Sequence, residues 1–136
     1  MKYLLDTNIC IALLRDNSPL VAQRFQQAIA HRGSLCISSL VLCELWFGAF
    51  NSSRTDENVE TLLRFLSGPV EVLPFDGADA YAAGEIRTDL QRAGKTIGSY
   101  DTLIAGQCLS KGLTVVTSNL SEFKRVKGLH CQDWAQ

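Results

Sequence analysis

Short apolar segments alternate with longer segments of helical periodicity along the whole chain. Apolar or β-branched runs predict strands at 2–5, 35–37, 70–75 and 113–117, with a final edge strand at 129–134. Helices are predicted from near Asn8 to residue 14 and over about 19–30, 39–50, 57–66, 76–93 and 100–111, with a short turn after Asn119. The sequence therefore predicts the α/β class, as a three-layer α/β/α sandwich around a mostly parallel sheet of four to five strands.

The chain is expected to be a single domain spanning residues 1–136. Its 46% hydrophobic and 20% charged residues fit an ordinary folded domain and exclude a disordered one. The longest apolar stretch, 35–50, is interrupted by Ser38, Ser39 and Glu44, and the N-terminus lacks the apolar run of a signal peptide. The five cysteines are Cys10, Cys36, Cys43, Cys108 and Cys131. Their odd number and scattered spacing favour reduced thiols in a cytoplasmic protein, with a zinc site as the alternative.

The charge is unevenly distributed, although the net charge is only −1. Residues 1–86 hold 6 Lys and Arg against 10 Asp and Glu, whereas residues 87–136 hold 7 Lys and Arg against 4 Asp and Glu. One interpretation is a solvated surface. The other is that the later basic residues contact phosphates around an acidic site.

Polar side chains follow two of the predicted strands. Asp6 comes directly after the first strand, and Asn119 follows the fourth. Ligands of parallel sheets gather beyond the carboxyl ends of the strands, so both residues are candidates for a site there. Taken alone, Asp6 is better explained as a helix cap than as a ligand, and Asn119 is also consistent with a cap.

Two further carboxylates lie in predicted helices. Glu44 is the one charged residue between Leu35 and Phe50, in a helix so apolar that we expect it to be largely buried. A buried carboxylate needs a cation, either a basic side chain or a metal ion. Asp101 lies in the first turn of the helix over 100–111, where the helix dipole alone would also favour it. Three carboxylates gathered at one sheet edge would repel one another, and their oxygen ligands predict Mg²⁺, or alternatively Mn²⁺.

Four sequence blocks resemble the PIN-domain family, in its VapC toxin branch. They are LLDTNI, CISSLVLCELWFGA, GEIRTDLQRAGKTIGSYDTLIAG and LTVVTSNLSEFKRVKGLHCQDW, in the order in which the family has them. The resemblance covers nearly the whole chain. It implies that Asp6, Glu44 and Asp101 are the metal-binding acids. It also implies that Thr7 and Thr117 support them.

The fourth acidic position of the family falls on Asn119, where many PIN domains have Asp. An amide can bind a cation through its oxygen but adds no charge. The resemblance therefore implies a catalytic set of Asp6, Glu44, Asp101 and Asn119 that holds one Mg²⁺ more readily than two.

The activity implied by the resemblance is endonucleolytic hydrolysis of RNA, leaving 5′-phosphate and 3′-hydroxyl ends. No histidine is placed as a general base, since His31 and His130 are expected on the surface. Within the branch, the resemblance points to members that cut the anticodon stem-loop of initiator tRNA. The candidate RNA-binding residues are Arg87, Arg92, Lys95, Lys124, Arg125 and Lys127.

The resemblance also implies partners. Members of the branch act as homodimers and as toxins of type II toxin–antitoxin pairs that inhibit translation. A VapB-type antitoxin holds them inactive by filling an apolar groove and placing a basic side chain in the acidic site. Trp46, Phe47 and Phe50 could line that groove or a dimer contact, or could simply be core residues.

Two other functions fit part of the sequence. A haloacid-dehalogenase-type phosphatase also has Asp after its first strand, but it needs a second Asp where this chain has Asn8. A catalytically weak RNA-binding PIN module would keep the fold and lose metal affinity through Asn119.

Overall fold

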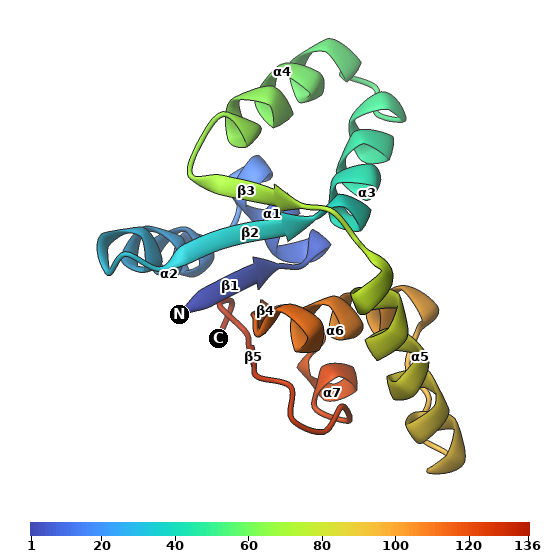
Figure 1. Cartoon of the computed structure of the whole chain (residues 1–136). Coiled ribbons are helices and arrows are strands. Elements are labelled where there is room, and N and C mark those ends of the chain that lie inside the picture. The colour runs from blue at the N-terminus through green and yellow to red at the C-terminus, as the bar shows by residue number, and fades with distance from the viewer.

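The computed structural model describes residues 1–136 and contains twelve helices and strands (Figure 1). In chain order they are β1 (Lys2–Leu5), α1 (Thr7–Arg15), α2 (Pro19–Ala30), β2 (Ser34–Ser38), α3 (Ser39–Phe50), α4 (Thr55–Leu66), β3 (Val70–Leu73), α5 (Gly77–Arg92), α6 (Ser99–Lys111), β4 (Thr114–Val116), α7 (Leu120–Phe123) and β5 (Cys131–Gln132).

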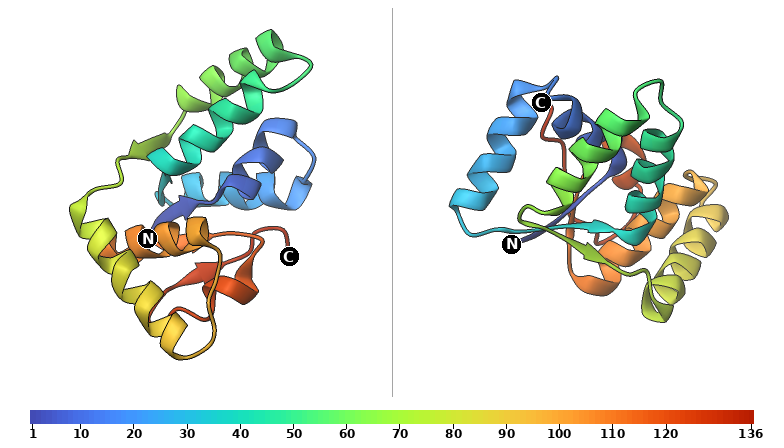
Figure 2. Two further views of the ribbon diagram at one scale, coloured as in Figure 1. Left: turned by 90° about the vertical axis from the view of Figure 1, so that its right-hand side faces the viewer. Right: turned by 90° about the horizontal axis from the view of Figure 1, so that it is seen from above.

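The five strands form one sheet in the order β3-β2-β1-β4-β5, and every neighbouring pair is parallel. From β1 to β3 the chain crosses the sheet in one direction, and from β3 to β5 it crosses back in the opposite direction. Because parallel crossovers are right-handed, helices α1–α4 cover one face and α5–α7 cover the other (Figure 2). The predicted fold class is confirmed, and β5 makes the sheet wholly parallel.

Local signals account for most boundaries. Ser18 caps α2 ahead of Pro19, Ser38 caps α3, and Asp76 with Asp79 forms a capping box at α5. Gly112 ends α6 at φ 67°, a left-handed conformation that suits glycine. The strand predicted at 70–75 ends at Leu73, because Pro74 has no N–H for the sheet ladder.

The prediction that α3 is largely buried is wrong. Only Val41, Leu45 and Ala49 are buried, whereas Phe47 and Phe50 are each 63% exposed and Glu44 is exposed. The α3–α4 pair projects past the sheet in Figures 1 and 2, so α3 buries one side and presents the other to solvent. None of the helices is long and apolar enough to cross a membrane.

Candidate active site

Asp6 occupies the junction between β1 and α1, at the carboxyl end of the sheet. Its Oδ1 accepts a hydrogen bond of 2.8 Å from the Thr7 N–H, and its Oδ2 accepts one of 2.9 Å from Thr117 Oγ1. Thr117 is brought there because β4 lies beside β1. Burial raises the pKa of the Asp6 carboxyl, while the bonds from Thr7 and Thr117 partly oppose that rise. The carboxylate is thus held in one orientation by donors from two neighbouring strand ends.

Asn119 joins two more carboxylates to this group. Its backbone N–H donates to Thr117 Oγ1 over 3.0 Å, and its Nδ2 donates to Asp101 Oδ2 over 2.8 Å and to Glu122 Oε2 over 2.7 Å. The Asn119 side chain makes no capping bond to α7. A continuous polar chain therefore runs from Asp6 through Thr117 and Asn119 to the Asp101–Glu122 pair.

The charges in this group are crowded. Burial, a hydrogen bond shared with Glu122 and the charge of Asp6 raise the pKa of Asp101 to about 7, against the opposing effect of Asn119. The pKa of Glu122 is lowered, first by its bond with Asp101. Of these two acids, Asp101 therefore keeps its proton to higher pH than Glu122, as expected of two carboxylates that share a site.

Tyr100 connects this group to the start of α1. Its hydroxyl lies 3.0 Å from Thr7 Oγ1, so the first turns of α6 and α1 are joined. Burial raises the pKa of the Tyr100 phenol, and the charges of Asp6 and Glu44 add to the rise. The phenol therefore stays protonated and can donate a hydrogen bond beside these acids.

Glu44 is the predicted site residue that the structure does not join to the others. It is exposed on α3 and makes no hydrogen bond or salt bridge. No three Asp, Glu, His or Cys side chains are grouped with the spacing of metal ligands. The structure thus brings together Asp6, Thr7, Asp101, Thr117 and Asn119, whereas Glu44 acts on this group only through its charge, which raises the pKa of Tyr100.

Comparison with known proteins places this arrangement in a family. The PIN domain profile matches residues 3–129 of the chain. The chain belongs to the PIN-domain family.

Relatives of this PIN domain are VapC proteins. It is 41% identical to the tRNA(fMet)-specific endonuclease VapC of Shigella flexneri, with 99% of each chain covered. It is 40% identical to the protein of the same name from Salmonella typhimurium, with 98% of each covered. It superposes with a TM-score of 0.90 on a chain of the VapBC2 crystal structure from Rickettsia felis, at 34% identity over 98% of this chain and 99% of that one. The VapC branch is therefore confirmed, and the phosphatase alternative is not supported.

Glu122 is a member of this polar group that was not among the candidates predicted from the sequence. It stands three residues after Asn119, in the stretch Ser118-Asn119-Leu120-Ser121-Glu122. An acid three residues after a polar strand-end residue is also typical of a helix start. That spacing was a usable signal, but it did not distinguish a cap from a site residue.

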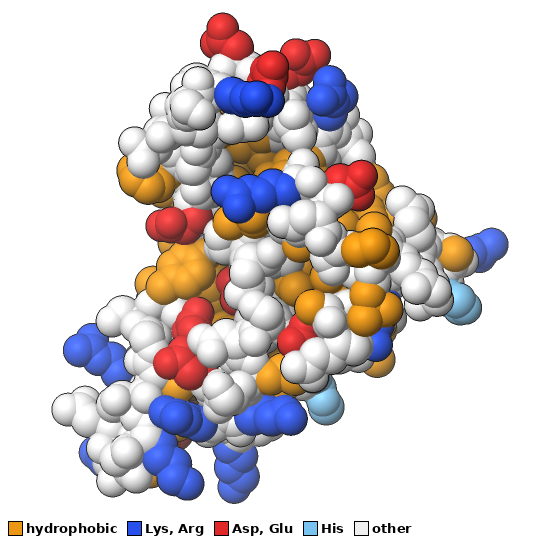
Figure 3. All heavy atoms as spheres, turned by 180° about the vertical axis from the view of Figure 1, so that it is seen from behind, with side chains coloured by type: hydrophobic (Ala, Val, Ile, Leu, Met, Phe, Trp, Pro, Cys, Tyr) orange, Lys and Arg blue, Asp and Glu red, His pale blue; other side chains and the backbone are white.

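Basic side chains lie at one end of the molecule. Figure 3 shows Lys and Arg side chains gathered at the lower end, which Figure 1 shows to be formed by α5 and α7. The RNA-binding candidates Arg87, Arg92, Lys95, Lys124 and Lys127 are all exposed, and none forms a salt bridge. Arg125 donates from Nη1 to the Thr96 carbonyl over 2.9 Å, which braces the loop before α6. Both His31 and His130 are exposed, as expected.

The raised pKa of Asp101 predicts an unusual pH dependence of stability. Its pKa moves from 3.8 to about 7 on folding, so between these values the folded chain binds more protons than the unfolded chain. The free energy of unfolding should therefore fall as pH rises through this window, by at most about 1.4 kcal/mol per pH unit for one proton. Asp6 contributes in the same direction.

Urea unfolding in EDTA, between about pH 5 and pH 7.5, measures this slope. Asp101→Asn should flatten it, because the substituted side chain cannot titrate. An equally steep slope in Asp101→Asn would assign the effect to other groups.

Proposed function

We propose that this PIN domain is a metal-dependent endoribonuclease and the toxin of a type II toxin–antitoxin pair, with tRNA as its substrate. The observation that carries the proposal is the Asp6–Thr117–Asn119–Asp101–Glu122 group at the carboxyl edge of the sheet. It occurs in a chain that matches a tRNA(fMet)-specific endonuclease over 99% of both lengths. The anticodon stem-loop of initiator tRNA is the proposed target, and inhibition of translation in the cytoplasm is the proposed consequence.

The residues present fit a hard divalent cation. The atoms of the group that could bind a metal ion are all oxygen atoms, and they come from Asp6, Asp101, Glu122 and the Asn119 amide. Such ligands suit Mg²⁺ or Mn²⁺. No basic side chain forms a salt bridge with these acids. Burial first, and then the neighbouring Glu122 and Asp6, raise the pKa of Asp101 to about 7. A bound cation would relieve this repulsion, and Glu44 would complete its ligands from α3. When bound, Mg²⁺ activates water and neutralises charge on the phosphate.

The chain's own residues would orient this chemistry. Thr7 and Thr117 fix the Asp6 carboxylate, and Asn119 fixes Asp101 against Glu122. Arg87, Arg92, Lys95, Lys124 and Arg125 would hold RNA phosphates, since their charges are exposed and α7, which precedes Lys124 and Arg125, also carries Glu122 of the acidic group.

Cleavage of purified tRNAs tests the proposal. We expect the protein with Mg²⁺ to cut initiator tRNA at one position in the anticodon stem-loop and to leave elongator methionine tRNA intact. EDTA should abolish the cut, and sequencing of new 5′ ends across total RNA should return the same site. RNA binding without cleavage under every condition would instead support the catalytically weak RNA-binding module.

Tyr100→Phe tests the hydrogen bond to Thr7. The ring is kept and only the hydroxyl 3.0 Å from Thr7 Oγ1 is lost. We expect kcat to fall about tenfold, as when a side chain that helps to orient a metal-binding residue is lost, with KM for tRNA unchanged. Thr7→Val, which removes the other half of the bond, should have the same effect. Full activity in both variants would show that the bond is dispensable.

A VapB-type antitoxin is the proposed partner, and a homodimer is the proposed state of the toxin. Phe47 and Phe50 are each 63% exposed, and Trp46 stacks on Phe50 with ring centroids 5.3 Å apart. A groove of about 300 Å³ lies between α1, α3 and α4, and Leu45, Gly48 and Ala49 line it from α3. Exposed aromatic groups of this kind favour a protein partner. Expression of the chain alone is expected to arrest bacterial growth, whereas co-expression of its antitoxin should restore growth and yield a copurifying complex.

A further inference from the structure

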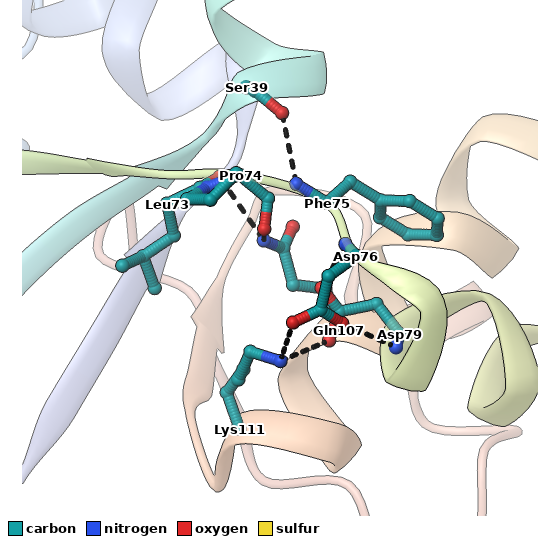
Figure 4. A network of polar contacts seen from close by, with 8 residues as sticks. All are labelled: Ser39, Leu73, Pro74, Phe75, Asp76, Asp79, Gln107 and Lys111. Carbon is teal, nitrogen blue, oxygen red and sulfur yellow. Dashed lines mark hydrogen bonds and ion pairs between the residues drawn. The ribbon is translucent and has the colours of Figure 1, made fainter.

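Residues 73–76, called here the crossover segment, lead from β3, an edge strand of the sheet, to the start of α5 (Figure 4). The Phe75 N–H donates to Ser39 Oγ over 3.1 Å, and Ser39 is the first residue of α3. Gln107 of α6 donates from Nε2 to the carbonyl oxygens of Leu73 and Pro74, each over 3.3 Å. The crossover segment is therefore bound to α3 through one side chain and to α6 through another.

Gln107 is an unusual choice for its position. The residue is completely buried, and its Oε1 has no hydrogen-bond partner. Turning the amide over would set Oε1 against two carbonyl oxygens, so the observed orientation is fixed by the crossover segment. A buried amide with one unsatisfied atom costs stability relative to an apolar side chain. The two hydrogen bonds that Gln107 donates to the crossover segment are the interactions that compensate for this cost.

Lys111 fastens the other end of the same region. Its Nζ lies 2.6 Å from Asp76 Oδ2 and 3.1 Å from Oδ1 of the fully buried Asp79. In the capping box of α5, the Asp76 N–H donates to Asp79 Oδ2 over 2.9 Å, and the Asp79 N–H donates to Asp76 Oδ1 over 3.0 Å. The last turn of α6 is therefore joined to the end of the crossover segment and to the first turn of α5.

The two helices joined in this way carry separate parts of the candidate site. Helix α3 packs on α1, α4, β2 and β3, whereas α6 packs on α5, α7 and β4. Glu44 on α3 makes no hydrogen bond or salt bridge with Asp101 or with any other residue of α6. The polar contacts of the crossover segment supply such a connection between the two helices.

We propose that the crossover segment is a strut between α3 and α6, and that Gln107 and Lys111 are positioning residues that set the separation of Glu44 from Asp101. This rests on the proposed ribonuclease function for its consequence, but the strut itself is a property of the fold. Loss of either side chain should let α3 and α6 move relative to each other. The acids would then meet a cation and the RNA in a wider range of geometries.

The test measures the α3–α6 distance directly in the full chain. Spin labels are placed at the native, exposed Cys43 of α3 and at Leu103→Cys of α6, after Cys131→Ser removes the other accessible thiol. Pulsed electron paramagnetic resonance then gives the distribution of distances between the two spin labels in Gln107→Leu and in Lys111→Met. Lys111→Arg keeps the charge, and Arg64→Met removes an exposed salt bridge on α4 as a matched control.

Gln107→Leu and Lys111→Met should each shift or broaden the distribution, whereas Lys111→Arg and Arg64→Met should match the parent. In the unlabelled variants, kcat for RNA should fall about 10- to 100-fold with KM unchanged. Urea unfolding shows whether each variant is folded. If one of Gln107→Leu and Lys111→Met does not fold, the other variant alone decides the test. Unaltered distributions in the folded variants would overturn the proposal, even if stability falls. If the parent protein cuts no RNA, the proposed function fails, while the distance measurement still decides the strut.

Discussion

Replacing Asp101 with asparagine is expected to slow tRNA cleavage by at least about a hundredfold and to leave the chain folded. Losing a side chain that only supports a metal ligand typically costs 10- to 100-fold, and a carboxylate of the group itself should cost more. The substitution keeps the shape of the side chain and removes its charge. Since Oδ2 of Asp101 accepts from Asn119 Nδ2 over 2.8 Å, the new amide must also present its oxygen to that donor.

Single-turnover cleavage at saturating Mg²⁺ measures this effect. Asp16→Asn is the matched control, because Asp16 is exposed and has φ 50°, a conformation that asparagine adopts readily. The control should cleave at the parent rate. Cleavage by Asp101→Asn within a few-fold of the parent would remove Asp101 from the proposed catalytic group.

The members of the proposed catalytic group that follow strand ends could be predicted from the sequence. Asp6 and Asn119 were identified because each follows an apolar strand, and neighbouring parallel strands end at one edge of the sheet. Asp101 was identified in the first turn of a predicted helix, Thr7 and Thr117 came from the family resemblance, and the structure brings all three to the same edge. Chain connectivity and hydrophobic pattern suffice for such residues, because the backbone places them.

The parts that the sequence did not predict depend on side-chain direction across distant segments. Asn119 could have capped α7, and only the fold turns its amide toward Asp101 and Glu122. The apolar composition of α3 did not reveal that its outer face, with Glu44, has no cover within the chain. The contacts of Gln107 join residues 33 and 34 positions apart, beyond the reach of local patterns.

Gly106→Ala is expected to destabilise the protein, although alanine is the better helix former by about 1 kcal/mol. A Cβ at Gly106 would lie 2.6–2.7 Å from the backbone N, the Cα and the Cβ of Ala83. Here α6 lies directly against the backbone of α5, so α5 would have to move away as a unit. Overpacking of this kind costs about 1–3 kcal/mol and should outweigh the gain in helix propensity.

The free energy of unfolding, measured in urea, shows whether Gly106→Ala stabilises or destabilises the protein. Gly84→Ala, in the middle of α5, is the matched control, because nothing lies within 4 Å of its added Cβ. The same chemical change should therefore stabilise the chain at Gly84 and destabilise it at Gly106. Because α6 also carries Tyr100 and Asp101, cleavage by Gly106→Ala should fall even where the variant is fully folded. Stabilisation at both positions would show that α5 and α6 are not in close contact at Gly106.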